Sequence, residues 1–427
     1  MVSRRQFIAS SAAVAGAATI HPTIAAASAL EEYPGHDVPA AIRALKPMTA
    51  DVVPISDDER RLRMEKARRL MVDTGLDAIF IEPGTTMAYF TGVSWGTSER
   101  MFALVLPARG EPAFICPAFE EARAREVIRF SNDIRFWQED ENPGALVAQV
   151  IRDRGVATGR IGIEQRARFF LADLIRTASP AVEQRIADAV TVGCRMIKSQ
   201  AELALLQRAN EITLAAFKAA FATMKEGMTQ DELGANVAAA YQALGVANHR
   251  ATPQFGVYSA YPHGSREPQQ LREGDVVLLD DGITIEGYES DITRTTVYGR
   301  PSTRQRQVWA LEKKAQQAAL DAARVGVPCE AIDAAARKVI TDAGFGPGYK
   351  VPGLPHRTGH GIGMDGHEAP NLVRGNKMPL APGMCFSDEP MIAIYGEFGI
   401  RLEDCWHMTE NGPVTFTPLS PSIEVPV

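Results

Sequence analysis

Two segments of the chain follow the same pattern, and this internal repetition constrains the fold more than any other feature. One segment begins at Gly227 and the other at Gly326; each closes on a second glycine 18 positions later and carries an apolar residue six positions after the first. The sequence predicts a helix before each segment, over 212–224 and 305–325, and strands after each, over 276–280, 291–298, 384–394 and 400–408. We expect two related ααββ halves, whose pseudo-two-fold centre is a natural place for a site fed by both. Chance similarity between alanine-rich helices that end in glycine is the alternative.

Upstream of the repeat, short apolar segments alternate with helical ones. The pattern predicts a charged helix over 57–74, a helix over 119–128, and strands over 77–81, 101–107, 113–116 and 160–163. Such alternation is typical of an α/β domain, which we assign to residues 56–192. An α+β domain with the duplicated ααββ pattern then occupies residues 195–420. Residues 30–55 contain four prolines and no clear period, which indicates an arm or linker.

The first 29 residues have the order of an export signal. Arg4 and Arg5 precede an uncharged apolar run over 8–20, and small residues then offer cleavage after Ala27 or Ala29. The paired arginines are typical of the twin-arginine route, which exports folded proteins. The apolar run is too short to be a membrane span, so we expect a periplasmic protein with no membrane attachment after cleavage. A frayed terminal tail is the alternative.

Composition narrows the class of partner. The net charge of -7 argues against a nucleic-acid partner, since phosphate binding needs a basic surface.

The five cysteines are scattered without a C-x-x-C pair, which argues against a zinc knuckle. We expect them to be small buried hydrophobes; a disulfide between Cys385 and Cys405 is a weaker alternative.

Four acidic residues stand in or beside apolar strands. Asp280 ends an apolar run and Asp291 opens the next strand; Glu389 and Glu403 lie on the apolar segments of the second half. A buried carboxylate is costly unless it is paired or binds a metal. The alternatives are a turn or capping role for the aspartates and an ion pair between Glu403 and Arg401. The side chain of Asp281 should point to the opposite face of its strand, so we do not expect it to be a ligand.

Three of the eight histidines fall within twelve residues. His356, His360 and His367 lie in a stretch with glycines on both sides of His360. Glycine lets a backbone approach a ligand closely. A lone histidine is usually structural, whereas this cluster indicates a ligand, proton shuttle or anion binder.

In order and spacing, these residues resemble the pita-bread metallopeptidases: methionine aminopeptidase, aminopeptidase P, prolidase and the metal-free creatinase. The resemblance covers residues 195–415, and the α/β domain resembles the creatinase-type N-terminal domain. It implies that Asp280 binds one metal, that His360 and Glu389 bind the other, and that Asp291 and Glu403 bridge the two.

The same resemblance implies residues on the substrate side. His263 matches a substrate-binding or proton-shuttling histidine, and His367 matches one that contacts the scissile region. His356 and Arg401 match residues that line the proline pocket, and Glu389 is expected to act as a proton carrier as well as a ligand. Arg100 from a partner subunit is a further candidate for the substrate carboxylate, since the family suggests a homodimer.

Four carboxylates and one imidazole favour a hard divalent ion, Mn²⁺ before Co²⁺ or Zn²⁺. Two ions about 3.5–4 Å apart would make a bridging hydroxide nucleophilic near neutral pH.

The stretches 95–100 and 371–376 look most like bacterial Xaa-Pro dipeptidases, so we expect cleavage of dipeptides before proline. The alternatives are an aminopeptidase P that acts on longer peptides, a creatinase-like hydrolase and a non-catalytic peptide-binding protein. The family tyrosine after Glu-Pro is replaced by Ala393, which removes a hydrogen-bond donor worth about 3 kcal/mol of barrier in other enzymes.

Overall fold

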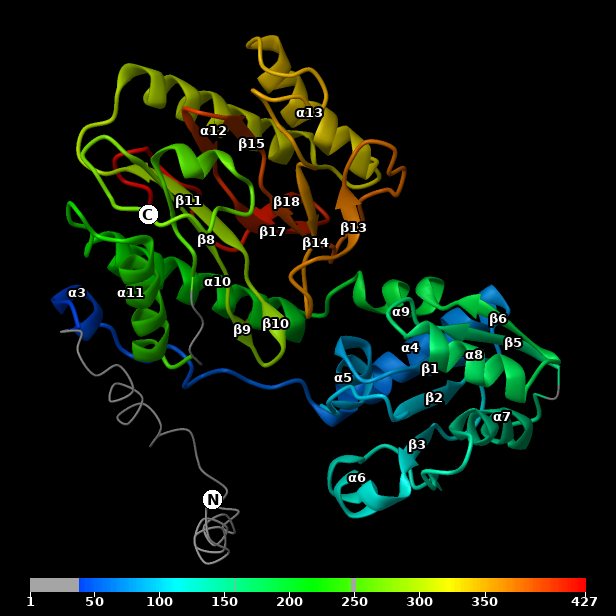
Figure 1. Ribbon diagram of the computed structural model, residues 1–427. Coiled ribbons are helices and arrows are strands. Elements are labelled where there is room, and N and C mark those ends of the chain that lie inside the picture. Colours follow the sequence, from blue (N-terminus) through cyan, green and yellow to red (C-terminus); the bar gives the residue numbers. More distant parts are fainter. Residues whose placement is uncertain (1–37, 157, 247–250) are drawn as a thin grey trace, which may run out of the picture.

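The computed structural model describes residues 38–156, 158–246 and 251–427 and forms two lobes (Figure 1). The predicted signal peptide, residues 1–29, lies outside the described residues. Within them, no helix is both long and apolar enough to cross a membrane.

The smaller lobe is built on a six-stranded mixed sheet. Its strand order is β4 (Ile134–Trp137), β3 (Ala113–Pro117), β2 (Ala103–Pro107), β1 (Ala78–Ile81), β5 (Gly159–Ile163) and β6 (Val182–Ile186). The central strand β1 pairs antiparallel with β2 and parallel with β5. This arrangement confirms the predicted α/β class of the first domain.

Helices cover both faces of this sheet, so the side chains of β1 are buried on both sides. Ile79 and Ile81 pack against α4 (Asp57–Thr74), α5 (Thr85–Thr91) and α9 (Asp188–Arg195). Phe80, on the opposite face, packs against α7 (Pro143–Asp153) and α8 (Phe169–Ala178). Helix α4 has the predicted bounds and ends at Gly75, whose φ of 68° is left-handed. The helix predicted over 119–128 is instead a 3-10 turn, η2 (Ala118–Glu120), followed by α6 (Glu121–Val127).

The larger lobe holds its strands between two helix pairs (Figure 1). Its first half contains α10 (Gln200–Phe221), α11 (Gln230–Ala243), β7 (Gln254–Phe255), η3 (Gly256–Ala260), β8 (Val276–Asp281), β9 (Thr284–Ile285), β10 (Tyr288–Glu289) and β11 (Ile292–Val297). Its second half contains α12 (Thr303–Ala322), α13 (Cys329–Asp342), β12 (Gly359–Gly361), β13 (Glu368–Leu372), β14 (Cys385–Asp388), β15 (Met391–Ile394), β16 (Phe398–Arg401), β17 (Asp404–Thr409) and β18 (Gly412–Thr415). Capping boxes at Ser199, Thr229 and Ser302 start α10, α11 and α12. Pro328 is the N-cap residue of α13.

Equivalent hydrogen bonds in the two halves support the predicted duplication. The N–H of Gly227 donates to the carbonyl of Leu271, and the N–H of Gly326 donates to that of Leu380, each at 2.8 Å. Isolated bridges follow the same pattern, from Thr229 to Gln270 and from Pro328 to Pro379. The halves therefore repeat their connections as well as their helices, and they meet where Thr293 forms a bridge with Glu403.

The described part of the predicted arm is packed against the larger lobe, so it is not a free linker. It contains α3 (Ala40–Arg43), and the side chains of Ile42 and Ile55 are buried in the same apolar cluster as α10 and α11. The N–H of Met48 also donates to the carbonyl of Leu244 at 2.9 Å. The prolines interrupt secondary structure here without preventing burial of the apolar residues between them.

Candidate metal centre

The first pair of acids comes from one antiparallel hairpin. Asp280 is near the end of β8, and Asp291 directly precedes β11. Because Thr293 pairs with Asp280 in the strand register, both carboxylates lie at the same end of the hairpin. The short strands β9 and β10 form the connection between them.

The second pair lies in breaks between strands rather than within strands as predicted. Glu389 stands between β14 and β15, and Glu403 stands between β16 and β17. Pro390 follows Glu389 and has no N–H for a ladder, which accounts for the first break. Since β14 and β17 are antiparallel and Asp388 pairs with Asp404, the two glutamates also lie at one end of their strands.

His360 is fixed by its backbone and by the glycines beside it. Gly359 and Gly361 touch the carbonyls of Ser387 and Glu368, so a side chain at either position would collide with backbone. The His360 N–H donates to Ser387 Oγ at 3.1 Å, and Nδ1 lies 3.1 Å from the Gly361 carbonyl. That contact leaves Nε2 as the nitrogen that faces the carboxylates.

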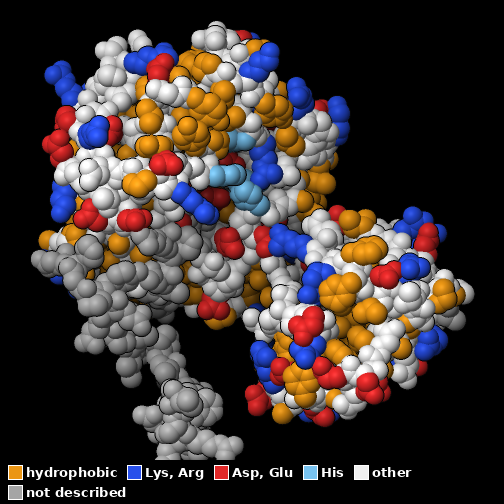
Figure 2. Space-filling model, viewed as in Figure 1, with side chains coloured by type: hydrophobic (Ala, Val, Ile, Leu, Met, Phe, Trp, Pro, Cys, Tyr) orange, Lys and Arg blue, Asp and Glu red, His pale blue; other side chains and the backbone are white. Residues whose placement is uncertain are grey.

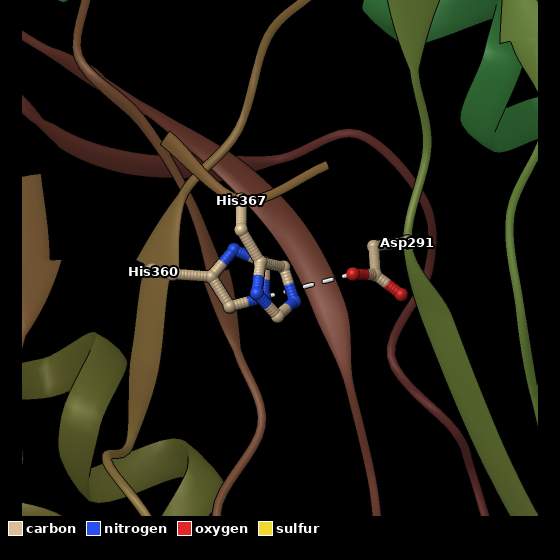
Figure 3. A group of neighbouring side chains, drawn as sticks. All are labelled: Asp291, His360 and His367. Carbon is tan, nitrogen blue, oxygen red and sulfur yellow. Dashed lines mark ion pairs between the residues drawn. The ribbon is translucent and has the colours of Figure 1, made fainter. Parts of the chain in front are cut away.

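All five predicted ligands converge at the junction of the two halves. His360 Nε2 lies 3.2 Å from Glu389 Oε1 and 3.6 Å from Asp291 Oδ2, the contact dashed in Figure 3. Three groups of three residues have ligand atoms within 4.8 Å of one another: His360 with the two glutamates, the two aspartates with Glu403, and Asp291 with His360 and His367. Asp291 and Glu403, the two residues with a predicted bridging role, each belong to two of these groups.

The unsatisfied atoms of this cluster fit a metal site. Glu403 and His360 are each 1% exposed, yet Glu403 Oε1 and His360 Nε2 have no hydrogen-bond partner within the described part of the chain. Buried polar atoms without a partner are rare and costly. Carboxylate oxygens and a neutral imidazole nitrogen are ligands for a divalent cation, so the atoms left without partners here are the ones that such an ion would use.

The pKa shifts have the same physical origin. Burial raises the pKa of Glu403 to about 8 and that of Glu389 to about 7, and for Glu403 the charge of Glu389 adds to the shift. Burial, then the charge of Glu403, raises the pKa of Asp291 well above its ordinary value. Burial lowers the pKa of His360, which keeps its imidazole neutral and able to bind a metal. Without a cation, the site holds carboxylates that resist ionisation together.

Two residues behind the ligands hold them in place. Thr293 Oγ1 lies 2.8 Å from Asp280 Oδ1 and 2.7 Å from Glu403 Oε2, and it links the two halves. Arg401 forms an ion pair with Asp280 and donates from Nε to Thr293 Oγ1 at 2.9 Å. The alternative pair of Arg401 with Glu403 is therefore wrong. Hydrogen bonds to ligand carboxylates orient them and tune metal affinity.

The structure brings the three predicted substrate-side histidines close to this cluster. Figure 3 shows the His367 ring beside the His360 ring. Their centroids are 3.9 Å apart, and burial lowers the pKa of His367 to about 4. His356 is largely buried, its Nε2 has no hydrogen-bond partner in the ranges that the structure describes, and burial lowers its pKa to about 3. His263 is exposed and near enough to lower both of those pKa values further. Histidines gather in one depression of the larger lobe (Figure 2).

The two arginines predicted to hold a substrate carboxylate are engaged elsewhere in this chain. Arg401 is 3% exposed, and its Nη1 donates to the carbonyl of Pro262 at 3.0 Å in addition to the contacts above. Arg100 is in the smaller lobe and pairs with Glu139 at 2.9 Å and with Glu99. Its proposed reach into a partner's site remains a prediction.

Sequence reasoning missed Arg357, which follows His356 directly. Its Nη2 lies 3.0 Å from His367 Nδ1, and among the residues that the structure describes no carboxylate pairs with it. The signal was a basic residue inside the histidine cluster.

Ala393, where the family has a tyrosine, is fully buried in an apolar cluster, so no hydroxyl reaches the site from this position.

Two further predictions concern neighbours of the ligands. Asp281 is absent from every group of converging ligand atoms and lies beside buried Tyr241, in keeping with its assignment to the opposite strand face. All five cysteines are free and buried, so the alternative of a Cys385–Cys405 disulfide is wrong. Cys405 Sγ lies 3.1 Å from the carbonyl of Asp291, which puts this thiol next to the ligands.

A cavity of about 580 Å³ opens beside the carboxylates. It is lined by both aspartates of the cluster and by His367. A second cavity of about 270 Å³ lies between the two lobes, and His367 and Arg357 line it as well. His367 therefore stands between the two spaces.

Comparisons with known proteins agree with this geometry. The family model described as "Metallopeptidase family M24" matches residues 204–410, and "Creatinase/Prolidase N-terminal domain" matches residues 63–197. A Xaa-Pro dipeptidase from Lactobacillus helveticus is 33% identical over 380 residues, which cover 85% of this chain and 99% of that protein.

Two solved structures extend the likeness to the fold. Dipeptidase PepE from Mycobacterium ulcerans is 33% identical with a TM-score of 0.80, covering 88% of this chain and 100% of that one. An X-Pro aminopeptidase from Thermotoga maritima is 27% identical with a TM-score of 0.70, covering 84% and 99%. With its creatinase-type N-terminal domain and its pita-bread catalytic domain, this chain belongs to the M24 family of metallopeptidases.

Proposed function

We propose that this peptidase is a metal-dependent Xaa-Pro dipeptidase. The observation that carries the proposal is the convergence of five ligands beside a guanidinium, that of Arg357, with no carboxylate partner among the described residues. A dipeptidase must hold the free carboxylate of its substrate next to the scissile bond, and a guanidinium is suited to that contact.

The ligand set would hold two divalent ions, Asp280 on one, His360 and Glu389 on the other, and Asp291 and Glu403 on both. Four carboxylates favour Mn²⁺, with Co²⁺ or Zn²⁺ as substitutes. When bound, such ions supply an activated water nucleophile and polarise a carbonyl.

The chain's own side chains account for the rest of the proposed reaction. Glu389 Oε1 lies 3.2 Å from His360 Nε2, and Glu389 would carry a proton to the leaving prolyl nitrogen. His367 and His263 border the ligands and would donate N–H groups to the substrate carbonyl. His356 would line the pocket for the proline ring, whose nitrogen carries no N–H when bonded.

The test compares Ala-Pro with Ala-Pro-Ala, first in EDTA and then with Mn²⁺ restored. We expect metal-dependent cleavage of Ala-Pro and little of the tripeptide. Cleavage of the tripeptide alone would favour an aminopeptidase, the activity in the name of the Thermotoga structure. No cleavage of either with metal present would favour a peptide-binding protein and overturn the proposal.

The bridging role has its own test. Substituting Glu403→Ala should lower bound metal below two ions per chain, as measured by elemental analysis after gel filtration. Retained stoichiometry of two would contradict a bridging Glu403. Ser422→Ala, far along the C-terminal segment from the ligands, is the control.

Assembly and location are part of the same proposal. Homodimerisation would bring the partner's Arg100 toward the site, and sedimentation analysis of wild type and Arg100→Ala tests it. Export of a folded protein by residues 1–29 predicts that Arg4→Lys with Arg5→Lys blocks appearance in the periplasmic fraction.

A further inference from the structure

The loop that carries His367 is held by the smaller lobe. Residues 362–367 connect β12 to β13, and the tip of this connection is Asp365. Asp365 accepts hydrogen bonds from Thr85 Oγ1 at 2.6 Å, Arg166 Nη1 at 2.8 Å and Arg195 Nη2 at 2.6 Å. Thr85 and Arg166 belong to the N-terminal domain, and Arg195 ends α9, which packs against the sheet of that domain.

A second carboxylate at the end of the same loop strengthens this joint. Arg195 Nη2 also donates to Glu368 Oε2 at 2.5 Å, and Lys198 Nζ donates to Glu368 Oε1 at 2.5 Å. These charges are largely removed from solvent: the side chains of Arg195 and Glu368 are 12% and 7% exposed. Charge-assisted bonds in such a setting are the strong ones, so the loop has bonds to the other lobe at its tip and at its end.

The loop residue that faces the predicted metal ligands is His367, two positions after Asp365. The His367 ring lies against that of His360, with 3.9 Å between the ring centroids and the planes tilted by 41°, and His367 Nδ1 lies 3.0 Å from Arg357 Nη2. The loop is also close-packed against the larger lobe, since a Cβ at Gly366 would lie 2.8 Å from Glu289 Oε2. Asp365 therefore joins the N-terminal domain to His367 over two residues of backbone.

We propose that Asp365 is a positioning residue, through which the N-terminal domain of the same chain sets the place of His367 over the metal ligands. The inference rests on the proposed peptidase function for its kinetic consequences. A displacement of about 1 Å at a reacting group can cost about 100-fold in rate, so loss of this joint should lower kcat while the five ligands stay intact.

The experiment measures kcat, KM and bound metal for Asp365→Ala, Asp365→Asn and Arg166→Ala with Ala-Pro as substrate. We expect Asp365→Ala to lower kcat at least tenfold with unchanged metal content. Asp365→Asn keeps an acceptor oxygen and should recover part of that loss. Arg166→Ala should lower kcat about threefold. Its matched control is Arg160→Ala, because both arginines are 53% exposed and ion-paired but Arg160 pairs with Glu183.

Two further measurements separate positioning from a general structural role. In a His367→Ala background, Asp365→Ala should cause less than a twofold further loss, because it acts through His367. Hydrogen exchange of the peptide spanning 361–368 should rise in Asp365→Ala and stay unchanged in Arg160→Ala. A kcat within twofold of wild type, additive losses, or unchanged exchange would each overturn the inference. An inactive wild type would instead refute the peptidase function and leave the exchange measurement to decide on the joint.

Discussion

The hydroxyl of Thr293 should control metal affinity, although it is not itself a predicted ligand. Thr293 is fully buried, and its Oγ1 lies within 2.8 Å of Asp280 and 2.7 Å of Glu403, one carboxylate from each half. Thr293→Val keeps the branched shape that suits a strand and removes only the hydroxyl. A hydrogen bond to a charged group contributes about 1.5–3 kcal/mol, and every 1.4 kcal/mol is about tenfold in binding. We therefore expect Mn²⁺ to bind about 10- to 100-fold more weakly.

The assay is calorimetric titration of Mn²⁺ into metal-free protein, with thermal unfolding measured alongside. Thr295→Val is the matched control: Thr295 is on the same strand, is fully buried, and bonds at 2.6 Å to the carbonyl of Arg401 rather than to a ligand carboxylate. Both variants should unfold at lower temperature, and only Thr293→Val should lose metal affinity. Affinity within threefold of wild type, or an equal loss in both variants, would refute the reasoning.

Three other outcomes follow from the site. Burial raises the pKa of Glu389 to about 7 and of Glu403 to about 8, above the usual 4.5, so these two carboxyl groups bind more protons in the metal-free folded state than in the unfolded chain. The site histidines, whose pKa values burial lowers, act in the opposite direction, but above about pH 7 they are largely neutral in both states. The melting temperature of the metal-free protein should therefore fall as pH rises from about 7 to 8, and a rise over that range would contradict these shifts. Arg357→Ala should raise KM for Ala-Pro about tenfold or more and leave KM for Ala-Pro amide unchanged; equal effects on both would argue against a carboxylate contact. Burial raises the pKa of Glu312 well above its usual value, so Glu312→Gln should shift the melting temperature little. Arg294→Met removes the ion-pair partner of the buried Asp404 carboxylate and should lower the free energy of unfolding by about 3–5 kcal/mol. Similar shifts in the two variants would show that Glu312 is ionised.

Local pattern was sufficient for much of the fold. Helix α4 has its predicted bounds because a capping serine precedes it and a left-handed glycine, Gly75, ends it. The duplicated halves were visible because each repeats a glycine-bounded helix before a buried strand pair. Predictions were weaker where a strand is interrupted: a mid-strand position was expected for Glu389 and Glu403, and both stand in breaks.

The candidate ligand set could be named from the sequence alone, because the order and spacing of five residues at the ends of apolar segments resemble those of the pita-bread metallopeptidases. Only the tertiary structure decided which arginines of the site form an ion pair with a carboxylate. Arg401 and Arg357 look alike in the sequence, yet one is paired with Asp280 and the other has no carboxylate partner among the described residues. The structure likewise decided that Asp365 joins the two domains. Pairing between charges depends on distances between segments more than a hundred residues apart, and these are set by the packing of whole domains rather than by local propensity or spacing.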